Sequence, residues 1–245
     1  MGGDPGREPR GVTLAPACPD HGQSATIGSF GTTMANHSLH APTVALTAQQ
    51  TRALDESGYL VIEAALSEGT VAGLRKAFES AEIQVSGTQH VTIATDTPSR
   101  AAWLGLERHP LIVAAAAHVL RAPFAAEVHG RNPLPGYGQQ GLHADAPPRE
   151  RMEPYTVLTA LWMLDPFMTD NGATRVVPGT HRLAAAIPKR LAQPLAVHPS
   201  EVVVCGTAGS VLIFNGHLWH SGRRNDSTRP RRAVQMVLRA RGSGL

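Results

Sequence analysis

The chain has 245 residues, a formal net charge of +3 and two cysteines. Its length fits one large domain, or one domain with an extension. Cys18 and Cys205 are too few and too isolated for a disulfide framework, which suits a reducing cytoplasm. No apolar stretch approaches the roughly 20 residues of a membrane span, and no basic segment precedes an apolar run, so neither a membrane protein nor a secreted protein is predicted.

The first part of the chain differs in composition from the rest. Residues 1–43 hold Gly, Pro, Ser, Thr and Ala without an apolar period, and they offer no face that could pack against a core. We therefore predict a disordered N-terminal extension over residues 1–43 and a single domain over residues 44–245. Met34 could also be the true start of the protein, which would place residues 1–33 outside it.

Helices are predicted first. Thr47 begins a capping box, and the helix that it opens ends at Gly58, a residue suited to the left-handed conformation. Tyr59–Ile62 follows as a short strand. Ser67 caps a second helix. The apolar side chains that share one face of this second helix are Val71, Leu74 and Phe78.

The next segment leads into a region of strands. Residues 83–109 are predicted to be loop, with room for one short strand, and Pro110 begins an alanine-rich helix that runs to about Leu120. Short β-prone runs separated by turn residues then follow. The predicted strands are Ala125–Arg131, Thr156–Leu164, Thr174–Val177, Glu201–Val204, Ser210–Phe214 and Arg232–Leu238. This order predicts a mainly β fold, a double-sheet jelly roll packed against N-terminal helices.

Candidate metal ligands lie between these strands. His143 and Asp145 are two positions apart, so in an extended segment their side chains leave from the same face. A His-x-Asp pair alone is most often part of a surface loop. A second histidine downstream, His217 or His220, would complete a set of two imidazoles and one carboxylate. Such a facial triad leaves open positions on iron and is typical of non-haem oxygenases.

Four blocks of sequence, in order and at compatible spacing, carry a resemblance to a known family. They are Leu46–Gln50 with Gly58–Glu63, His143-Ala-Asp145, Asn171–His181, and Gly209–Phe214 with Trp219-His220, Asn225 and Arg231. From about Leu46 to Leu238 the chain resembles the phytanoyl-CoA dioxygenase family. These are Fe(II)- and 2-oxoglutarate-dependent oxygenases built on a double-stranded β-helix, a cupin-like jelly roll.

The resemblance implies a specific metal site. His143, Asp145 and His220 would be the iron ligands and the catalytic centre, because Asn225 and Arg231 follow His220 at the spacing found in the family. His217 would then lie in the approach to the site. In halogenating members the position of Asp145 is Gly or Ala and chloride takes the vacant place, so the carboxylate here implies oxygenation.

Arg231 is the expected anchor for 2-oxoglutarate. A guanidinium forms two charge-assisted hydrogen bonds with a carboxylate, and the family spacing favours Arg231 over its neighbours Arg229 and Arg232. Gln140 and Thr174 occupy positions that hydrogen-bond 2-oxoglutarate in related members, although a turn amide and a strand hydroxyl are equally simple interpretations. His129 also points from a predicted strand that could line the pocket.

The arginines near the C-terminus allow a further interpretation. They form a solvated basic hairpin or a positive pocket mouth for an anionic ligand. Nucleic-acid binding is disfavoured because aromatic residues make up 4% of the chain and no predicted helix carries the charge. The basic residues are Arg223, Arg224, Arg229, Arg231, Arg232, Arg239 and Arg241.

The sequence thus predicts a cytoplasmic 2-oxoglutarate-dependent dioxygenase, a monomer or homodimer that binds neither nucleic acid nor membrane. With Fe(II), 2-oxoglutarate and O2 it would hydroxylate a small molecule of secondary metabolism and release succinate and CO2. Desaturation, epoxidation and rearrangement share the same site. A metal-binding cupin-like protein without 2-oxoglutarate turnover is the alternative. The loops at 83–109, 146–155 and 182–200 would form the pocket rim.

Overall fold

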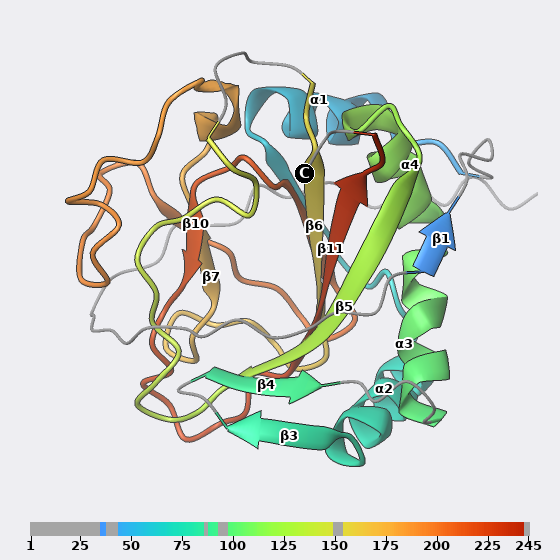
Figure 1. The fold of residues 1–245 in the computed structure, drawn as a ribbon. Helices are drawn as coiled ribbons and strands as arrows, with labels where there is room; N and C mark the ends of the chain where they lie inside the picture. The colour runs from blue at the N-terminus through green and yellow to red at the C-terminus, as the bar shows by residue number, and fades with distance from the viewer. Residues whose placement is uncertain (1–34, 38–43, 86–87, 93–97, 149–153, 243–245) are drawn as a thin grey trace, which may run out of the picture.

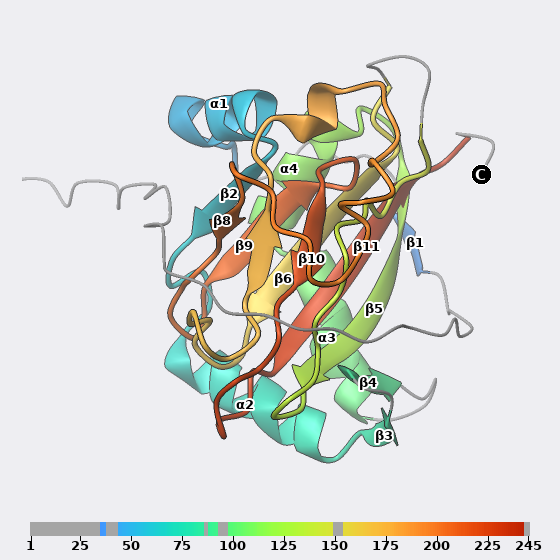
Figure 2. The same cartoon turned by 90° about the vertical axis from the view of Figure 1, so that its left-hand side faces the viewer.

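Two antiparallel β-sheets face each other, and helices cover the outer side of the larger one (Figures 1 and 2). This computed structural model describes residues 35–37, 44–85, 88–92, 98–148 and 154–242. The arrangement is the predicted jelly roll with helices packed against it. None of the helices in these ranges is long and apolar enough to cross a membrane.

The larger sheet has eight strands. Neighbouring strands in it are antiparallel throughout the described residues. The strands in spatial order are β2 (Tyr59–Ile62), β9 (Val211–Asn215), β6 (Val157–Met163), β11 (Ala233–Ala240), β5 (Phe124–Pro133), β4 (Thr88–Thr92) and β3 (Glu82–Val85), with β1 (Ala35–His37).

The smaller sheet has three strands in the order β10, β7 and β8. Their bounds are β10 (His220–Gly222), β7 (Thr174–Val176) and β8 (Val202–Val203). An isolated bridge between His143 and His220 adds the segment after β5 to the free edge of β10. This bridge brings together two parts of the chain that lie far apart in the sequence.

Three of the helices form where local signals predicted them. The helix α1 (Ala48–Glu56) has the complete Thr47 capping box, and α2 (Glu68–Glu79) is capped by Ser67. After α1, Gly58 adopts a φ of +82°, which the absence of a Cβ permits. The remaining helices are α3 (Pro98–Glu107), α4 (Pro110–Val119) and the 3-10 turn η1 (Thr180–Arg182).

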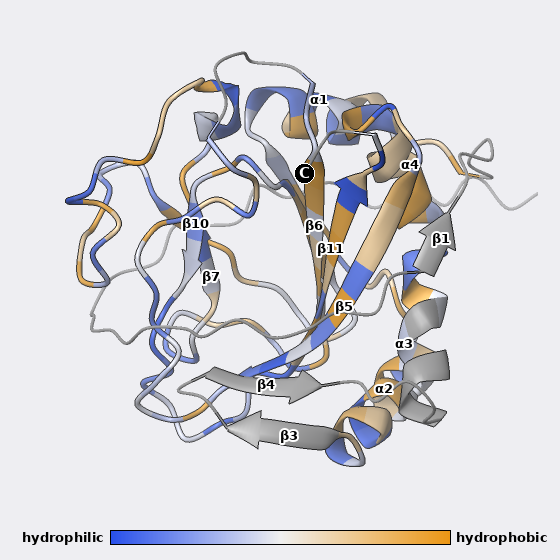
Figure 3. Cartoon of the chain, viewed as in Figure 1, coloured by the Kyte–Doolittle hydropathy of each residue, from blue (hydrophilic) through white to orange (hydrophobic). Residues whose placement is uncertain are grey.

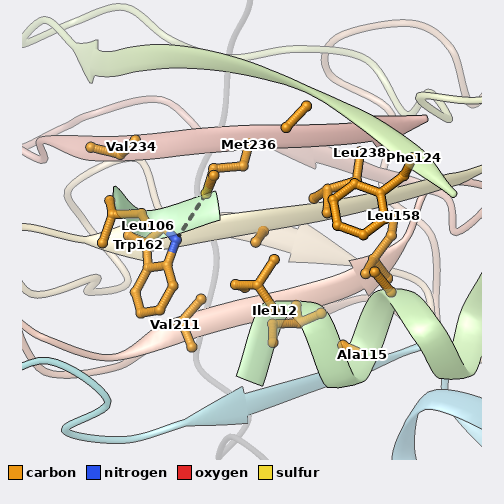
Figure 4. Close-up of a cluster of buried hydrophobic side chains, with 14 of the residues drawn as sticks. Leu106, Ile112, Ala115, Phe124, Leu158, Trp162, Val211, Val234, Met236 and Leu238 are labelled. Carbon is orange, nitrogen blue, oxygen red and sulfur yellow. Dashed lines mark hydrogen bonds between the residues drawn. The ribbon is translucent and has the colours of Figure 1, made fainter. Parts of the chain in front are cut away.

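The main hydrophobic core lies between the larger sheet and the helices. Figure 4 shows Trp162 of β6 and Met236 of β11 beside Ile112 of α4, and the Trp162 indole N–H donates to the Met236 sulfur at 3.2 Å. All three side chains are fully buried. Removing a large apolar side chain of this kind from water stabilises the fold by about 1.5–3 kcal/mol.

The prediction for residues 83–109 was wrong. This region contains most of the hairpin of β3 and β4 and all of α3, in place of a loop with at most one short strand. The hairpin forms because β4 pairs with β5, a partner about 40 positions away that local patterns do not reveal. The helix forms because Trp103 and Leu106 of α3 are buried in the core.

Other boundaries differ less. The strand predicted at Glu201–Val204 is reduced to β8, and β10 was not predicted because its three residues carry no β-prone pattern. The strand β1 lies within the segment predicted to be a disordered extension and adds to the edge of β5. Residues 1–34 and 38–43 lie outside the described residues, so the extension and the domain boundary stay predictions.

Candidate metal centre

His143, Asp145 and His220 converge on one point between the two sheets. One potential ligand atom from each residue lies within 4.8 Å of the others. Two backbone hydrogen bonds hold the histidines together, because the amide of each donates to the carbonyl oxygen of the other at 2.9 Å. The side chains therefore meet on a backbone frame that is fixed before any ligand binds.

Neighbouring groups orient each of the three side chains. The Nδ1 atom of His143 lies 3.0 Å from the carbonyl oxygen of Gly141, and that of His220 lies 2.9 Å from the carbonyl oxygen of Leu218. A carbonyl accepts only from a protonated nitrogen, so each Nε2 is left to coordinate a cation. The Thr159 hydroxyl donates to Oδ2 of Asp145, which leaves Oδ1 toward His220.

Electrostatics favour the protonation states that a cation requires at His143 and Asp145, whereas a proton on His220 would have to be displaced. Burial and the nearby His220 lower the pKa of His143 to about 4, so this imidazole is neutral near pH 7. Burial alone would raise the pKa of Asp145, but the two histidines and the Thr159 hydroxyl lower it well below the usual range. Burial also opposes a charge on His220, whereas Asp145 raises the pKa of His220. A neutral imidazole and a carboxylate are metal ligands.

His217 takes no part in this cluster. Its Nε2 lies 3.3 Å from both the backbone nitrogen and the hydroxyl of Thr156, and its ring packs against Tyr155 with centroids 5.8 Å apart. Of the two histidines left open by the sequence, the structure brings His220 to His143 and Asp145.

A pocket surrounds the three candidate ligands. It contains all of the residues predicted to bind the metal or 2-oxoglutarate, it does not include His129, and it adds the polar residues Arg131 and Gln235. Its walls include apolar side chains from two strands of the larger sheet, and the Phe214 ring packs against His220 with centroids 4.5 Å apart. The predicted site residues on the wall are Gln140, His143, Asp145, Thr174, His220 and Arg231.

The contacts of Arg231 differ from those of the nearby Arg229 and Arg232. Arg232 pairs with Asp165 and Arg229 pairs with Asp170 at the surface. Arg231 is buried, lines the pocket, and stacks over the ring of Phe167 with 4.5 Å between its central carbon and the ring centroid. Burial and the nearby Arg131 lower the pKa of Arg231 to about 9, so it is still a cation near pH 7.

Gln140 and Thr174 line the pocket from the side of the smaller sheet. The Gln140 side-chain oxygen accepts a hydrogen bond from the amide of Gly222 at 3.0 Å, which turns the amide group to a defined orientation. Thr174 begins β7, where its neighbour Arg175 is buried. Gln140 therefore holds a fixed polar group beside the candidate ligands, and Thr174 adds a buried hydroxyl to the same wall.

Arg131 is a charged pocket residue that sequence reasoning missed, as it missed Gln235. It lies on β5, and its Nε donates to the side-chain oxygen of Gln235 at 2.6 Å. A signal was present in the sequence. On β5 the apolar Ala126 and Val128 alternate with polar residues, so Arg131 lies on the opposite face of the strand from them, together with Glu127 and His129. Figure 3 shows this strand changing from hydrophobic near α4 to hydrophilic near β4.

The loop predicted at 182–200 is attached to the metal-binding segment. The amide of Leu142 donates to the carbonyl of Leu191 at 3.2 Å, and the Gln139 side chain donates to the carbonyl of Pro194 at 2.6 Å. Buried Arg175 donates to the carbonyl of Ala196 at 2.8 Å. In the rim segment 146–155, residues 149–153 lie outside the described ranges.

The sequence profile of the phytanoyl-CoA dioxygenase (PhyH) family matches residues 54–233. The chain belongs to this family. The expected family and the jelly-roll fold are thereby confirmed.

Curated relatives match part of the chain. Dioxygenase trt7 of Aspergillus terreus is 32% identical over 143 residues, which cover 53% of this chain and 47% of that protein. An uncharacterised protein of Mycobacterium tuberculosis is 33% identical over 102 residues, which cover 41% of this chain and 34% of that protein. The matched region thus spans less than half the length of either relative.

Solved structures share the fold. HygX from Streptomyces hygroscopicus, with nickel, 2-oxoglutarate and hygromycin B bound, superposes with a TM-score of 0.66 at 19% identity over 80% of this chain and 88% of that chain. The 2-oxoglutarate-dependent epimerase SnoN from nogalamycin biosynthesis gives a TM-score of 0.62 at 21% identity over 80% and 86%. The expected cofactors, Fe(II), 2-oxoglutarate and O2, agree with these structures and with the three converging side chains.

Proposed function

We propose that this PhyH protein is an Fe(II)- and 2-oxoglutarate-dependent dioxygenase that hydroxylates a small organic molecule of secondary metabolism. One observation carries the proposal, namely that two imidazoles, a carboxylate and a buried guanidinium share a single pocket. Bound iron and 2-oxoglutarate would supply the oxidant, with 2-oxoglutarate converted to succinate and CO2 as O2 is consumed.

Different residues of the pocket would bind the metal and 2-oxoglutarate. His143, Asp145 and His220 would hold the iron, and Arg231 would bind the far carboxylate of 2-oxoglutarate with its paired N–H groups. Gln140 and Thr174 would orient the cosubstrate through hydrogen bonds. Their positions on the pocket wall support these roles.

Two further residues would hold the side chains of Asp145 and His220 in a fixed arrangement. Thr159 holds one oxygen of Asp145, which prevents the carboxylate from rotating. The Phe214 ring covers one side of His220, and apolar walls exclude the water that would compete with substrate.

Relatives support a small-molecule substrate. HygX has been solved with hygromycin B, and SnoN with a nogalamycin compound. The neighbours named as an epimerase and a carbocyclase carry the same fold, so hydroxylation is one of several outcomes that the scaffold supports. Asp145 favours oxygenation over halogenation because its carboxylate fills the place that a halide would need.

The test uses the purified protein with Fe(II) and 2-oxoglutarate under air. Succinate formation, followed by mass spectrometry, should exceed that of the Asp145→Ala variant, because oxidation of 2-oxoglutarate proceeds slowly even without the natural substrate. Under anaerobic conditions, 2-oxoglutarate should add a visible charge-transfer absorption to the Fe(II) protein. The alternative, a metal-binding cupin-like protein, predicts Fe(II) binding with neither succinate nor the absorption band.

A further inference from the structure

The pocket holds a second guanidinium besides Arg231. Arg131 lies directly opposite Ala233 of β11, and Gln235 lies two positions further along the same strand. Ala233 packs in the cluster between the two sheets, whereas Val234 and Met236 pack toward the helices. The side of β11 that carries Gln235 therefore faces the pocket, and Arg131 faces it too.

The orientation of Arg131 is fixed by one strong contact. Its Nε donates to the side-chain oxygen of Gln235 at 2.6 Å, and both residues line the pocket. Because the guanidinium is planar, a bond at Nε sets the direction of the two terminal nitrogens. Gln235 thereby holds the fork of Arg131 on the pocket wall.

The balance of charge in this pocket calls for an anion. Burial lowers the pKa of Arg131 to about 10, and burial together with Arg131 lowers that of Arg231 to about 9, so both remain cations near pH 7. Among the described wall residues the carboxylate is that of Asp145, which the metal would need. Two like charges in one buried site are costly unless a ligand of opposite charge joins them.

Along β11, Arg131 lies closer to the candidate metal ligands than Arg231 does. Asp145 is bonded by Thr159, which pairs with Val237 of β11, whereas Arg131 pairs with Ala233 and reaches Gln235, in the direction of Val237. Arg231 precedes Ala233 by two positions, on the side away from Val237, and stacks over Phe167. A ligand with a carboxylate at each end fits this arrangement.

We propose that Arg131 binds the carboxylate of 2-oxoglutarate that adjoins its keto group, and that Gln235 is the positioning residue that aims Arg131 at it. This inference rests on the proposed function. Arg231 binds the far carboxylate, so one guanidinium binds each end of the 2-oxoglutarate dianion. When 2-oxoglutarate is bound, Arg131 would offset the negative charge of its near carboxylate beside the carboxylate of Asp145.

The experiment measures binding without turnover. Protein loaded with Ni(II) is titrated by calorimetry with 2-oxoglutarate and with 2-oxovalerate, which has the same keto-acid end but no far carboxylate. Arg131→Gln should weaken both ligands by a similar factor, on the order of tenfold or more. Arg231→Gln should weaken 2-oxoglutarate alone. Arg239→Gln removes a partly exposed arginine of β11 that pairs with Glu127, and it should change neither affinity.

Two further variants guard against misfolding. Arg131→Lys keeps the charge without the fork and should lose part of the affinity for both ligands. Gln235→Leu should cause a smaller loss of affinity, again similar for the two ligands, since it disturbs only the orientation of Arg131. Each variant should retain Ni(II) binding and a thermal transition, which separates lost ligand contacts from lost structure.

Three results have distinct meanings. Unchanged affinity of Arg131→Gln and Arg131→Lys for both ligands would overturn the inference. A loss confined to 2-oxoglutarate would also overturn it, because Arg131 would then share the far carboxylate with Arg231. Failure of the wild-type Ni(II) protein to bind 2-oxoglutarate would instead refute the proposed function itself.

Discussion

The two faces of the larger sheet carry different chemistry on the same strands. Toward the helices, β11 presents Val234, Met236 and Leu238, which are fully buried in the main core. Toward the smaller sheet the same strand presents Gln235, and β5 presents Arg131. The alternation of a strand thus places a stable apolar layer directly behind the polar pocket, so the backbone that carries the pocket residues is held by packing that no ligand touches.

The largest expected effect is the loss of activity when a candidate metal ligand on the pocket face is removed. His143→Ala, Asp145→Ala and His220→Ala should each reduce succinate formation to background, because losing one of three ligands removes both metal affinity and geometry. The proteins should still fold, since the helix-side core is untouched. Iron content and circular dichroism check both points.

His217→Ala is the matched control for the histidine assignment. It should keep most of the activity because His217 contacts Thr156 and Tyr155 and lies outside the cluster. An inactive His217→Ala alongside an active His220→Ala would show that the distal ligand has been assigned to the wrong histidine.

A substitution on the apolar face should instead reduce stability and leave metal binding intact. Trp162→Ala should destabilise the fold by about 3–5 kcal/mol, since the indole is fully buried and its loss leaves a cavity. Urea unfolding measures the change. Protein that remains folded in the cold should still bind iron, because Trp162 points away from the pocket. A wild-type unfolding midpoint would contradict the assigned core.

Within the pocket, Arg231→Gln should raise the KM for 2-oxoglutarate strongly. A buried carboxylate that loses its charged partner costs about 2–5 kcal/mol. Arg229→Gln and Arg232→Gln should leave this KM nearly unchanged, because their guanidiniums pair with Asp170 and Asp165. Equal effects in all three variants would mean that only diffuse positive charge matters.

The smallest expected effect is that of halide. The carboxylate of Asp145 occupies the place that chloride would need, so high chloride or bromide should not change the rate of the wild-type enzyme. Mass spectrometry of the products tests this directly. A product with chlorine in place of hydrogen would overturn the role of Asp145 as an iron ligand.

Local signals predicted the elements with strong periods and caps. The Thr47 capping box and the Ser67 cap are both formed, and β6 and β11 lie within a residue or two of their predicted bounds. The hairpin of β3 and β4 was missed because its stability comes from pairing with β5, a contact between distant parts of the chain. Short-range patterns contain no record of such a partner.

The site residues also divide into those that the sequence predicted and those that depend on contacts between distant parts of the chain. His143, Asp145 and Arg231 could be found because family spacing points to them, and the choice of His220 over His217 also followed from spacing. Arg131 could not be found in this way, since its role depends on which face of β5 meets the pocket. That face is defined by the pairing register with β11.

The loop between η1 and β8 has a consequence for how such enzymes diversify. It is fastened beside the metal-binding segment through the carbonyl oxygens of Leu191, Pro194 and Ala196. Backbone anchors do not depend on which side chains the loop carries. Exposed positions such as Leu195 and Val197 can therefore change under selection while the anchors stay in place. A lineage could acquire new substrates by mutating this loop without re-evolving its iron chemistry.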